Sequence, residues 1–219
     1  MAATRRHLLA TAVGGALTVL LPGTGAWAQP AAAPYKLVML GDSLTAGLGL
    51  VRAQTIPTRL EAALAARGAR VRVVNAGASG ETSADVLARL GFSVPADTSA
   101  VLIAVGGNDM LQGLPPRDLA ANLRAMIGQL KSRRIPAALA GMRASANLGA
   151  AYRREFDAVY PTLARALNVQ LYPFLLDGVA LNPALNQQDG IHPNAAGAEI
   201  IARRLAPFVV SALGIRAGR

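Results

Sequence analysis

Short apolar segments alternate along this chain with longer segments in which apolar residues recur at helical spacing. Predominantly apolar runs of four or five residues are typical of strands in a parallel sheet that is covered on both faces. Such runs predict strands at residues 36–40, 71–74 and 101–105, with weaker candidates at 137–140 and 169–172.

Five other segments carry apolar residues three or four positions apart, as expected for helices that bury one face. Gly68 is expected to end the first helix, and Thr82 or Ser83 to cap the second. The segments are centred on residues 56–64, 86–90, 119–130, 156–167 and 200–209.

This alternation of strands and helices with short links predicts an α/β fold, with a parallel sheet and helices on both faces. Ligands of such folds bind at the carboxyl ends of the strands. Polar or glycine-rich residues follow three of the expected strands, and a fourth polar segment precedes the last helix. These segments are residues 41–43, 75–80, 106–109 and 189–192. We expect them to meet at one end of the sheet.

The first 28 residues have the pattern of a cleaved export signal. Arg5 and Arg6 precede an uncharged apolar stretch, and Ala26-Trp27-Ala28 is a typical cleavage site. The arginine pair also resembles a twin-arginine signal. The alternative is an uncleaved membrane anchor, but the apolar stretch is short for a span of a bilayer. Residues 29–34 are then a flexible lead-in and residues 35–219 one domain, in the periplasm or secreted, with no stable membrane insertion after cleavage.

Composition excludes several kinds of chemistry. The chain has no cysteine, which rules out disulfides and thiolate catalysis, and His192 is the only histidine after the leader. The leader holds two of the 22 lysines and arginines and none of the 12 acidic residues, so the remaining chain carries a formal charge of +8. The basic residues are scattered without interleaved aromatics, which favours a solvated surface over a nucleic-acid site. Attraction to anionic lipid headgroups is a further alternative.

The polar segments contain the parts of a serine nucleophile system. His192 is the candidate general base, Asp189 lies three residues before it, and Ser43 follows the first strand. Each residue also has an ordinary structural alternative: Ser43 as a helix cap and Asp189 as a turn residue. The backbone N–H groups of Ser43 and Gly80 and the side chain of Asn108 are candidate oxyanion donors. The Gly-x-Ser-x-Gly elbow and the phosphate-binding loop are both absent, which disfavours ordinary α/β-hydrolases and nucleotide hydrolases.

Four ordered motifs together resemble those of the SGNH hydrolases, also called GDSL lipases and esterases. The similarity extends over nearly all of the chain after the leader, and it is greatest to bacterial periplasmic arylesterases, thioesterases and lysophospholipases. The motifs are Gly41-Asp42-Ser43-Leu44, residues 75–83, Gly106-Gly107-Asn108-Asp109 and residues 189–194.

This resemblance implies a flavodoxin-like three-layer αβα sandwich with five parallel strands, and no metal or organic cofactor. It assigns Ser43 as nucleophile, His192 as base and Asp189 as its partner. It places the Ser43 amide, Gly80 and Asn108 in the oxyanion hole, with Gly80 rather than Gly77 as the matching glycine.

The expected function is hydrolysis of short- to medium-chain acyl or aryl esters, with thioesters and lysophospholipids as extensions. Aromatic residues are few, so the acyl pocket is expected to be aliphatic, with Leu111, Leu114 and Met142 as candidates if they do not simply pack in the core. Two alternatives stay open: a carbohydrate O-deacetylase on the same scaffold, and a non-catalytic module that binds a polar ligand. Nothing in the sequence marks an oligomer interface.

Overall fold

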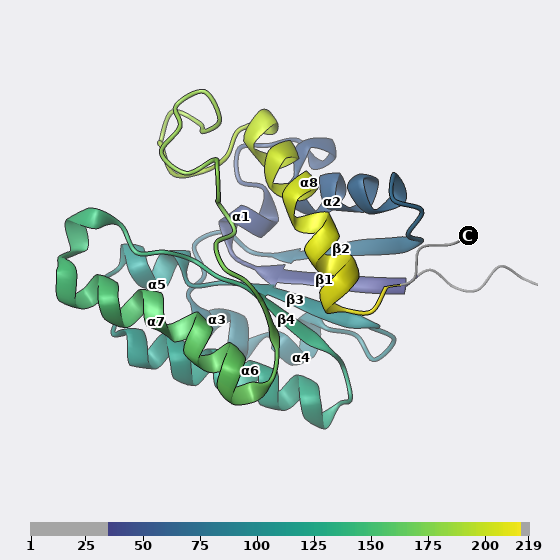
Figure 1. Cartoon of the computed structure of the whole chain (residues 1–219), viewed down its shortest axis with the longest axis horizontal. Helices are drawn as coiled ribbons and strands as arrows, with labels where there is room; N and C mark the ends of the chain where they lie inside the picture. Colours follow the sequence, from purple (N-terminus) through teal and green to yellow (C-terminus); the bar gives the residue numbers. More distant parts are fainter. Residues whose placement is uncertain (1–34, 216–219) are drawn as a thin grey trace, which may run out of the picture. The chain divides into compact units, whose positions relative to one another are not determined.

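The structure is a computed structural model that describes residues 35–215 (Figure 1). The predicted export signal and the lead-in at residues 29–34 lie outside the described residues. The described part begins with the first strand and ends just after the last helix.

Five strands form one sheet in which every neighbouring pair is parallel. Their spatial order is β2-β1-β3-β4-β5, so the chain crosses over β1 between β2 and β3. All five predicted strands are confirmed, and β1 and β2 each extend farther than the pattern indicated. The strands are β1 (Tyr35–Gly41), β2 (Val71–Gly77), β3 (Ala100–Ala104), β4 (Ala137–Ala140) and β5 (Gln170–Tyr172).

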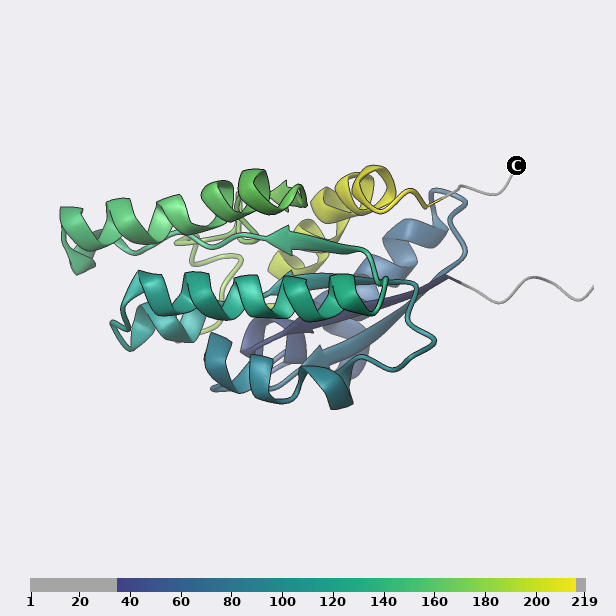
Figure 2. The same cartoon turned by 90° about the horizontal axis from the view of Figure 1, so that it is seen from below.

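Helices cover both faces of this sheet, which confirms the three-layer αβα arrangement (Figure 1). One layer contains α1 (Ser43–Ala46), α2 (Ile56–Ala65) and α8 (Ala195–Ala212). The other contains α3 (Ser83–Ala88), α4 (Leu90–Ser93), α5 (Gly107–Leu111), α6 (Pro116–Ser132) and α7 (Ala150–Leu167). Figure 2 shows α6 and α7 lying side by side in this second layer. Two short 3-10 helices, at Arg52–Gln54 and Ala146–Leu148, complete the described elements.

The burial of the strands follows from their places in the sheet. In β1, which has a strand on each side and a helix layer on each face, the four residues from Leu37 to Leu40 are fully buried. Strand β2 is at the edge, and there Val71 and Val73 are buried while Arg72 is exposed. A central strand therefore has a continuous run of apolar residues, whereas buried apolar and exposed polar residues alternate in an edge strand.

The predicted helix at residues 86–90 is instead two short helices that meet at Arg89. Thr82 caps α3: its hydroxyl accepts from the Asp85 amide, and the Asp85 carboxylate accepts in return from the Thr82 amide. Of the two predicted caps, Thr82 is therefore the observed one. Arg89 has φ −98° and ψ 4°, which is outside helical geometry and starts a separate turn of helix.

The last helix, α8, is capped by a side chain of the loop before it. Asn194 is the N-cap of α8, and its side-chain oxygen accepts from the amides of Ala196 and Gly197. Pro193 therefore lies in the preceding loop.

The amino end of β1 and the carboxyl end of α8 lie next to each other, since the Tyr35 hydroxyl donates to the Leu213 carbonyl over 3.2 Å. They are at the right of Figure 1, whereas α1, α5 and the loop before α8 are at the left, where the strands end. Within residues 35–215, the helices include none with the length and apolar character of a membrane span.

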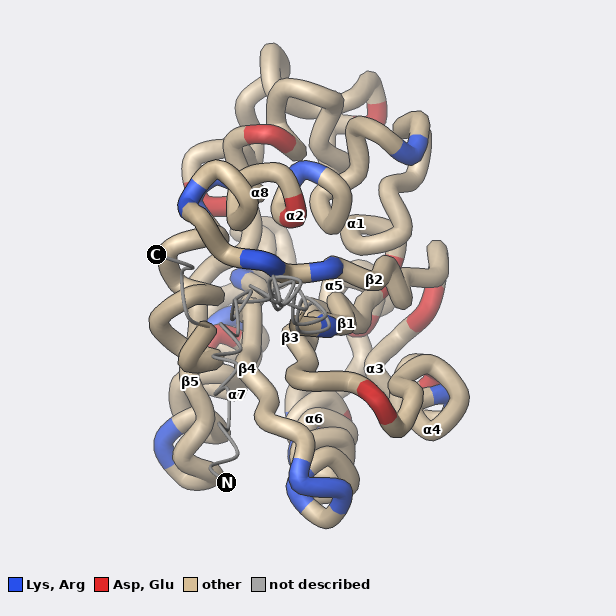
Figure 3. Tube along the Cα trace, turned by 90° about the vertical axis from the view of Figure 1, so that its right-hand side faces the viewer, with Lys and Arg blue, Asp and Glu red and all other residues tan. Residues whose placement is uncertain are grey.

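Lys and Arg residues are distributed over several elements, with Asp and Glu residues among them (Figure 3). Ion pairs join Lys36 to Asp97, Arg59 to Glu199, Arg72 to Glu61, Arg89 to Glu81 and Arg204 to Asp177. Such pairs at a surface contribute little to stability, about 0–1 kcal/mol each. They do offset part of the positive charge of the surface.

Candidate active site

Ser43 is the first residue of α1, immediately after β1. Its neighbour Asp42 is the N-cap, and the Asp42 carboxylate accepts from the Leu44 amide over 3.0 Å. Gly47 ends the helix after one turn with a left-handed conformation. This short turn of helix holds Ser43 at the carboxyl end of a central strand, with 8% of the residue exposed.

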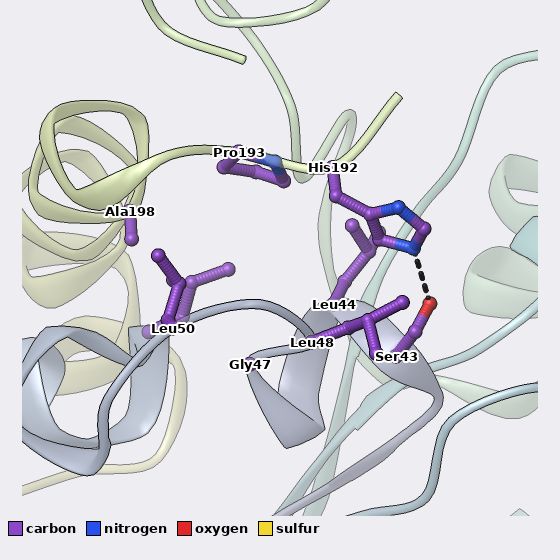
Figure 4. Close-up of a pocket in the computed structure, with 9 residues that line it drawn as sticks. Ser43, Leu44, Gly47, Leu48, Leu50, His192, Pro193 and Ala198 are labelled. Atoms are coloured by element: carbon purple, nitrogen blue, oxygen red, sulfur yellow. Dashed lines mark hydrogen bonds between the residues drawn. The ribbon is translucent and has the colours of Figure 1, made fainter. Parts of the chain in front are cut away.

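His192 reaches Ser43 across 149 positions of the sequence. Its Nε2 atom lies 2.8 Å from Ser43 Oγ, and Figure 4 shows the ring above the start of α1. The Nδ1 atom on the other side of the ring lies 2.7 Å from Asp189 Oδ2. An imidazole with its proton on Nδ1 satisfies both contacts, donating to the carboxylate and accepting from the serine hydroxyl.

Asp189 is held by the backbone of its own loop. Its Oδ1 atom accepts from the amides of His192 and Ile191, over 2.9 and 3.0 Å. These hydrogen bonds, that from the His192 amide first, lower the pKa of Asp189 to about 2. The side chain is 42% exposed, yet at neutral pH it carries a negative charge beside the imidazole.

The loop that carries both residues closes on itself before α8 begins. An isolated antiparallel bridge joins Asn186 to Pro193. The Gln187 amide donates to the His192 carbonyl over 2.8 Å, and the Gln187 side chain donates to the Leu48 carbonyl over 2.7 Å. The last contact links this loop to the segment that follows α1, and so to the side of the site that contains the serine.

The two other predicted oxyanion donors follow β2 and β3 in the chain. Asn108 is in α5, and its Nδ2 atom donates to the Glu81 carbonyl over 2.7 Å. Since an amide nitrogen carries two hydrogens, this contact leaves one N–H of Asn108 for another acceptor. Gly80, next to Glu81, has φ +85°. The structure therefore joins the second and third motifs directly.

Gly77 and Gly80 have different structural roles. A Cβ on Gly77 would lie 2.1 Å from the Ala46 amide nitrogen, so this glycine allows β2 to pass close to α1. A Cβ on Gly80 would meet nothing within 4 Å, and there it is the left-handed backbone that favours glycine. Gly77 is explained by packing, which leaves Gly80 as the glycine with a free approach to its backbone.

Two buried carboxylates behind the site had no role in the sequence-based predictions. Asp42 and Asp109 are each 2% exposed. Burial, the largest effect, raises the pKa of Asp42 to about 6, against hydrogen bonds from the backbone. Asp109 accepts from both the amide and the hydroxyl of Ser83. In the sequence, only their positions next to Ser43 and Asn108 indicated a role near the site. Their burial is visible only in the structure.

A small apolar pocket opens beside Ser43 and His192 (Figure 4). Its other lining residues are Leu44, Gly47, Leu48, Leu50, Ile56, Pro193 and Ala198. The lining of this pocket is mainly aliphatic, and the candidates Leu111, Leu114 and Met142 are not part of it. Leu111 is 55% exposed on α5, whereas Met142 is buried in the core. The periodicity could not reveal this, because the pocket is built from the segment after α1 and the start of α8.

Residues 35–215 contain no cluster of three His, Asp or Glu side chains that could hold a metal ion.

Comparison with known proteins identifies the family. The sequence pattern described as the GDSL-like lipase/acylhydrolase family matches residues 39–200, which include Ser43, Asp189 and His192. This chain belongs to the GDSL-like lipase/acylhydrolase family.

Relatives of this GDSL hydrolase with assigned activities are esterases and thioesterases. An arylesterase of Vibrio mimicus is 37% identical over 182 residues, which cover 83% of this chain and 91% of that protein. Thioesterase 1/protease 1/lysophospholipase L1 of Escherichia coli (strain K12) is 37% identical over 184 residues, covering 82% of this chain and 87% of that protein.

Solved structures agree with this assignment. The crystal structure of TesA superposes with a TM-score of 0.75 at 36% identity, covering 80% of this chain and 97% of that one. AlinE4, a SGNH-hydrolase family esterase, superposes with a TM-score of 0.71 at 41% identity, covering 84% and 99%. The predicted fold and family are therefore confirmed, and this GDSL hydrolase is a carboxylic ester hydrolase.

Proposed function

We propose that this enzyme hydrolyses esters through a covalent acyl-enzyme on Ser43, with His192 as general base and Asp189 as its partner. The observation that carries the proposal is the continuous chain of contacts from Ser43 Oγ to His192 Nε2, 2.8 Å, and from His192 Nδ1 to Asp189, 2.7 Å. Nucleophile, base and orienting carboxylate in this geometry are the parts that acyl transfer requires.

In the first step, Ser43 Oγ forms a bond to the acyl carbon while its proton moves to His192 Nε2. The bond to the leaving alcohol then breaks, and His192 returns the proton to that oxygen. In the second step, water gives a proton to Nε2 and attacks the acyl carbon, and the carboxylic acid leaves as Ser43 regains its hydrogen. Asp189 stabilises the imidazolium that forms in both steps.

Negative charge develops on the carbonyl oxygen in both steps and needs hydrogen-bond donors. The proposed donors are the backbone amides of Ser43 and Gly80 and the side chain of Asn108. The Ser43 amide is at the start of α1, where backbone N–H groups have no partner within the helix. Asn108 keeps one free N–H beyond its bond to Glu81.

The proposed substrates are short- to medium-chain acyl esters and aryl esters, with thioesters and lysophospholipids as extensions. The side chains that line the pocket beside Ser43 are mainly aliphatic, which favours an apolar acyl group there. The names of the relatives, an arylesterase and a thioesterase/lysophospholipase, support the wider range.

The decisive experiment compares Ser43→Ala with Ser132→Ala on a p-nitrophenyl ester. Ser132 is a matched control at the end of α6, where its hydroxyl donates to the Gln129 carbonyl. Loss of the nucleophile should lower kcat/KM by at least about 10⁴-fold, since triad members act as a unit. The control should keep the wild-type rate. Turnover by a folded Ser43→Ala variant would refute the acyl-enzyme mechanism.

A series of p-nitrophenyl esters of increasing acyl length, run beside an acyl-CoA and a lysophospholipid, tests the substrate range. The pocket size predicts that kcat/KM is highest for short chains and falls as the chain lengthens. A maximum at long chains would contradict the acyl site at this pocket while leaving the serine chemistry intact.

We further propose that the enzyme is exported and that residues 1–28 are removed. The support is the arginine pair, the apolar stretch and the cleavage site of the leader, together with a family match that begins only at residue 39. Mass measurement of protein recovered from the periplasm should show a chain that begins at Gln29. A recovered chain that still begins at Met1 would contradict cleavage.

A further inference from the structure

Arg89, between α3 and α4, makes hydrogen bonds in three directions behind the turn that follows β2. Its Nε atom lies 2.5 Å from a carboxylate oxygen of Glu81. Its Nη2 atom donates to the carbonyls of Gly41 and Ala76, over 2.9 and 3.0 Å, and its Nη1 donates to the Ser93 hydroxyl over 2.8 Å. One guanidinium group therefore joins two strands, a turn and a short helix.

The two carbonyl acceptors lie at the carboxyl ends of neighbouring strands. Gly41 ends β1 and is separated from Ser43 by a single residue. Ala76 lies opposite Leu40 in the register of β2 with β1. Arg89 is thus attached to the part of the sheet that holds the nucleophile.

Glu81 connects this anchor to both of the outer oxyanion donors. It follows Gly80 directly in the chain, so a change in the position of Glu81 also moves the Gly80 peptide. Its carbonyl accepts from Asn108 Nδ2 over 2.7 Å, so the same residue also orients the amide of Asn108.

The ion pair between Arg89 and Glu81 is partly shielded from water, with side chains 22% and 23% exposed. Shielding strengthens a charge-assisted hydrogen bond relative to a fully exposed pair. Neither residue lines the pocket beside Ser43. An effect of this pair on catalysis would therefore pass through the residues that it holds.

We propose that Arg89 is a positioning residue for the oxyanion hole: through Glu81 it fixes the Gly80 amide and the Asn108 side chain relative to Ser43. The proposal rests on the function proposed above. The planar guanidinium group has five N–H donors in a fixed fork and can bind all of these acceptors at once. The ammonium group of lysine cannot span the same acceptors with the same geometry.

Donors stabilise a developing oxyanion only when they are already in place. Loosening Glu81 should therefore weaken binding of the transition state more than binding of the ester in its ground state. The expected signature is a lower kcat at nearly constant KM.

The test measures kcat and KM of Arg89→Lys and Glu81→Gln on the p-nitrophenyl ester that the wild type turns over best. We expect kcat to fall by about 10- to 100-fold, the size of effect that a small misplacement of catalytic groups produces. KM should stay within about twofold, since the substrate pocket is untouched. Circular dichroism and thermal unfolding establish that each variant is folded.

Matched controls are Arg133→Lys and Glu61→Gln. Arg133 also donates to two backbone carbonyls, those of Val94 and Pro95, and Glu61 also pairs with an arginine, Arg72. The hydrogen bonds of these two control residues involve neither the turn that carries Gly80 nor α5. Both controls should keep kcat within about twofold of the wild type.

A double-mutant cycle with Asn108→Ala separates positioning from a general loss of structure. If Glu81 acts by orienting Asn108 and Gly80, Glu81→Gln should lower kcat much less in the Asn108→Ala background than in the wild type, because coupled residues are not additive. The proposal would be overturned if the two substitutions lowered kcat by fully multiplicative factors. It would also be overturned if only KM changed, or if both Arg89→Lys and Glu81→Gln kept the wild-type kcat. If Arg89→Lys does not fold, Glu81→Gln alone decides.

Ser43→Ala in the same assay keeps this proposal distinct from the proposed function. Loss of turnover in Ser43→Ala with wild-type kcat in the folded Arg89 and Glu81 variants would overturn the positioning role alone. Turnover in Ser43→Ala would overturn both.

Discussion

The two sides of the candidate active site are held in place by different kinds of structure. Ser43 and Asn108 lie at the ends of β1 and β3, where Asp42 and Asp109 behind them are each 2% exposed. His192 lies in the loop between β5 and α8, and its partner Asp189 has a side chain that is 42% exposed. The sheet holds the first side, and hydrogen bonds within a loop hold the second.

The proposed catalytic groups are therefore supported in different ways on the two sides. The proposed oxyanion donors follow strands β1, β2 and β3: Ser43 is buried and Asn108 partly buried, whereas Gly80 is exposed. The proposed base and its proposed partner belong to the loop, where the amides of Ile191 and His192 hold the Asp189 carboxylate. Substitutions at the strand ends should therefore lower kcat strongly. Substitutions that remove a charge from the loop should have a smaller effect on kcat, because solvent screens that charge.

The largest effect in this comparison is expected for Asn108→Ala. It removes a proposed oxyanion donor at the end of the sheet, and the loss of one such donor lowers kcat by about 10²- to 10³-fold. Steady-state kinetics on a p-nitrophenyl ester measures it. Asn168→Gly is the control, because Asn168 has φ +49° at the end of α7, a conformation that glycine accepts. Wild-type kcat in Asn108→Ala would remove this side chain from the mechanism.

A second effect should appear in stability as a function of pH, from Asp42. Burial raises its pKa in the folded protein from 3.8 to about 6, so the folded state holds this proton more tightly than the unfolded state. The stabilisation of the folded state by protonated Asp42 is fully present below about pH 4 and is lost as pH rises through about 6. The free energy of unfolding should fall by up to about 3 kcal/mol over this interval.

Urea unfolding between pH 4 and pH 7 measures this slope in the wild type and in Asp42→Asn. Asparagine keeps an oxygen for the Leu44 amide but cannot ionise, so the variant should show a flatter profile. An unchanged slope in Asp42→Asn would show that another group is responsible.

The smallest effect is expected for Asp189→Asn on the exposed side. Because the pKa of Asp189 is lowered from 3.8 to about 2, its contribution to the free energy of unfolding is fully present above about pH 4 and is lost as pH falls through about 2. Neutralising the charge should lower kcat/KM by about 10- to 100-fold, less than the largest losses known for buried triad carboxylates. A fall in kcat/KM of about 10⁴-fold would contradict the expected difference between the two sides, since it would equal the loss known for a buried carboxylate.

Local pattern was sufficient where the deciding contacts are close in sequence. Leu37 and Met39 belong to an apolar run because β1 is covered on both faces, so the run predicted a central strand. The pairing of Asp189 with His192 spans three positions, and a turn brings such residues together. The sequence also placed Ser43 and Asn108 correctly just after strands.

The break at Arg89 and the make-up of the pocket could not be predicted in this way. A helical pattern of apolar residues continues through positions 86–90, while contacts of Arg89 with β1 and β2 accompany the change to a second helix. Leu48 and Ala198 share one pocket although they are far apart in the chain. Periodicity reports which face of an element is buried, but it does not report which other element covers that face.

The sequence by itself determined the five strands, the polar residues at their ends and the local pair of Asp189 and His192, because these depend on burial pattern and short-range hydrogen bonds. Only the tertiary structure decided that Ser43 Oγ lies 2.8 Å from His192, that Asp42 is buried and titrates near 6, and that Arg89 joins two strand ends to Glu81. Those properties arise where distant segments pack together, and packing depends on the whole chain rather than on any one stretch of it.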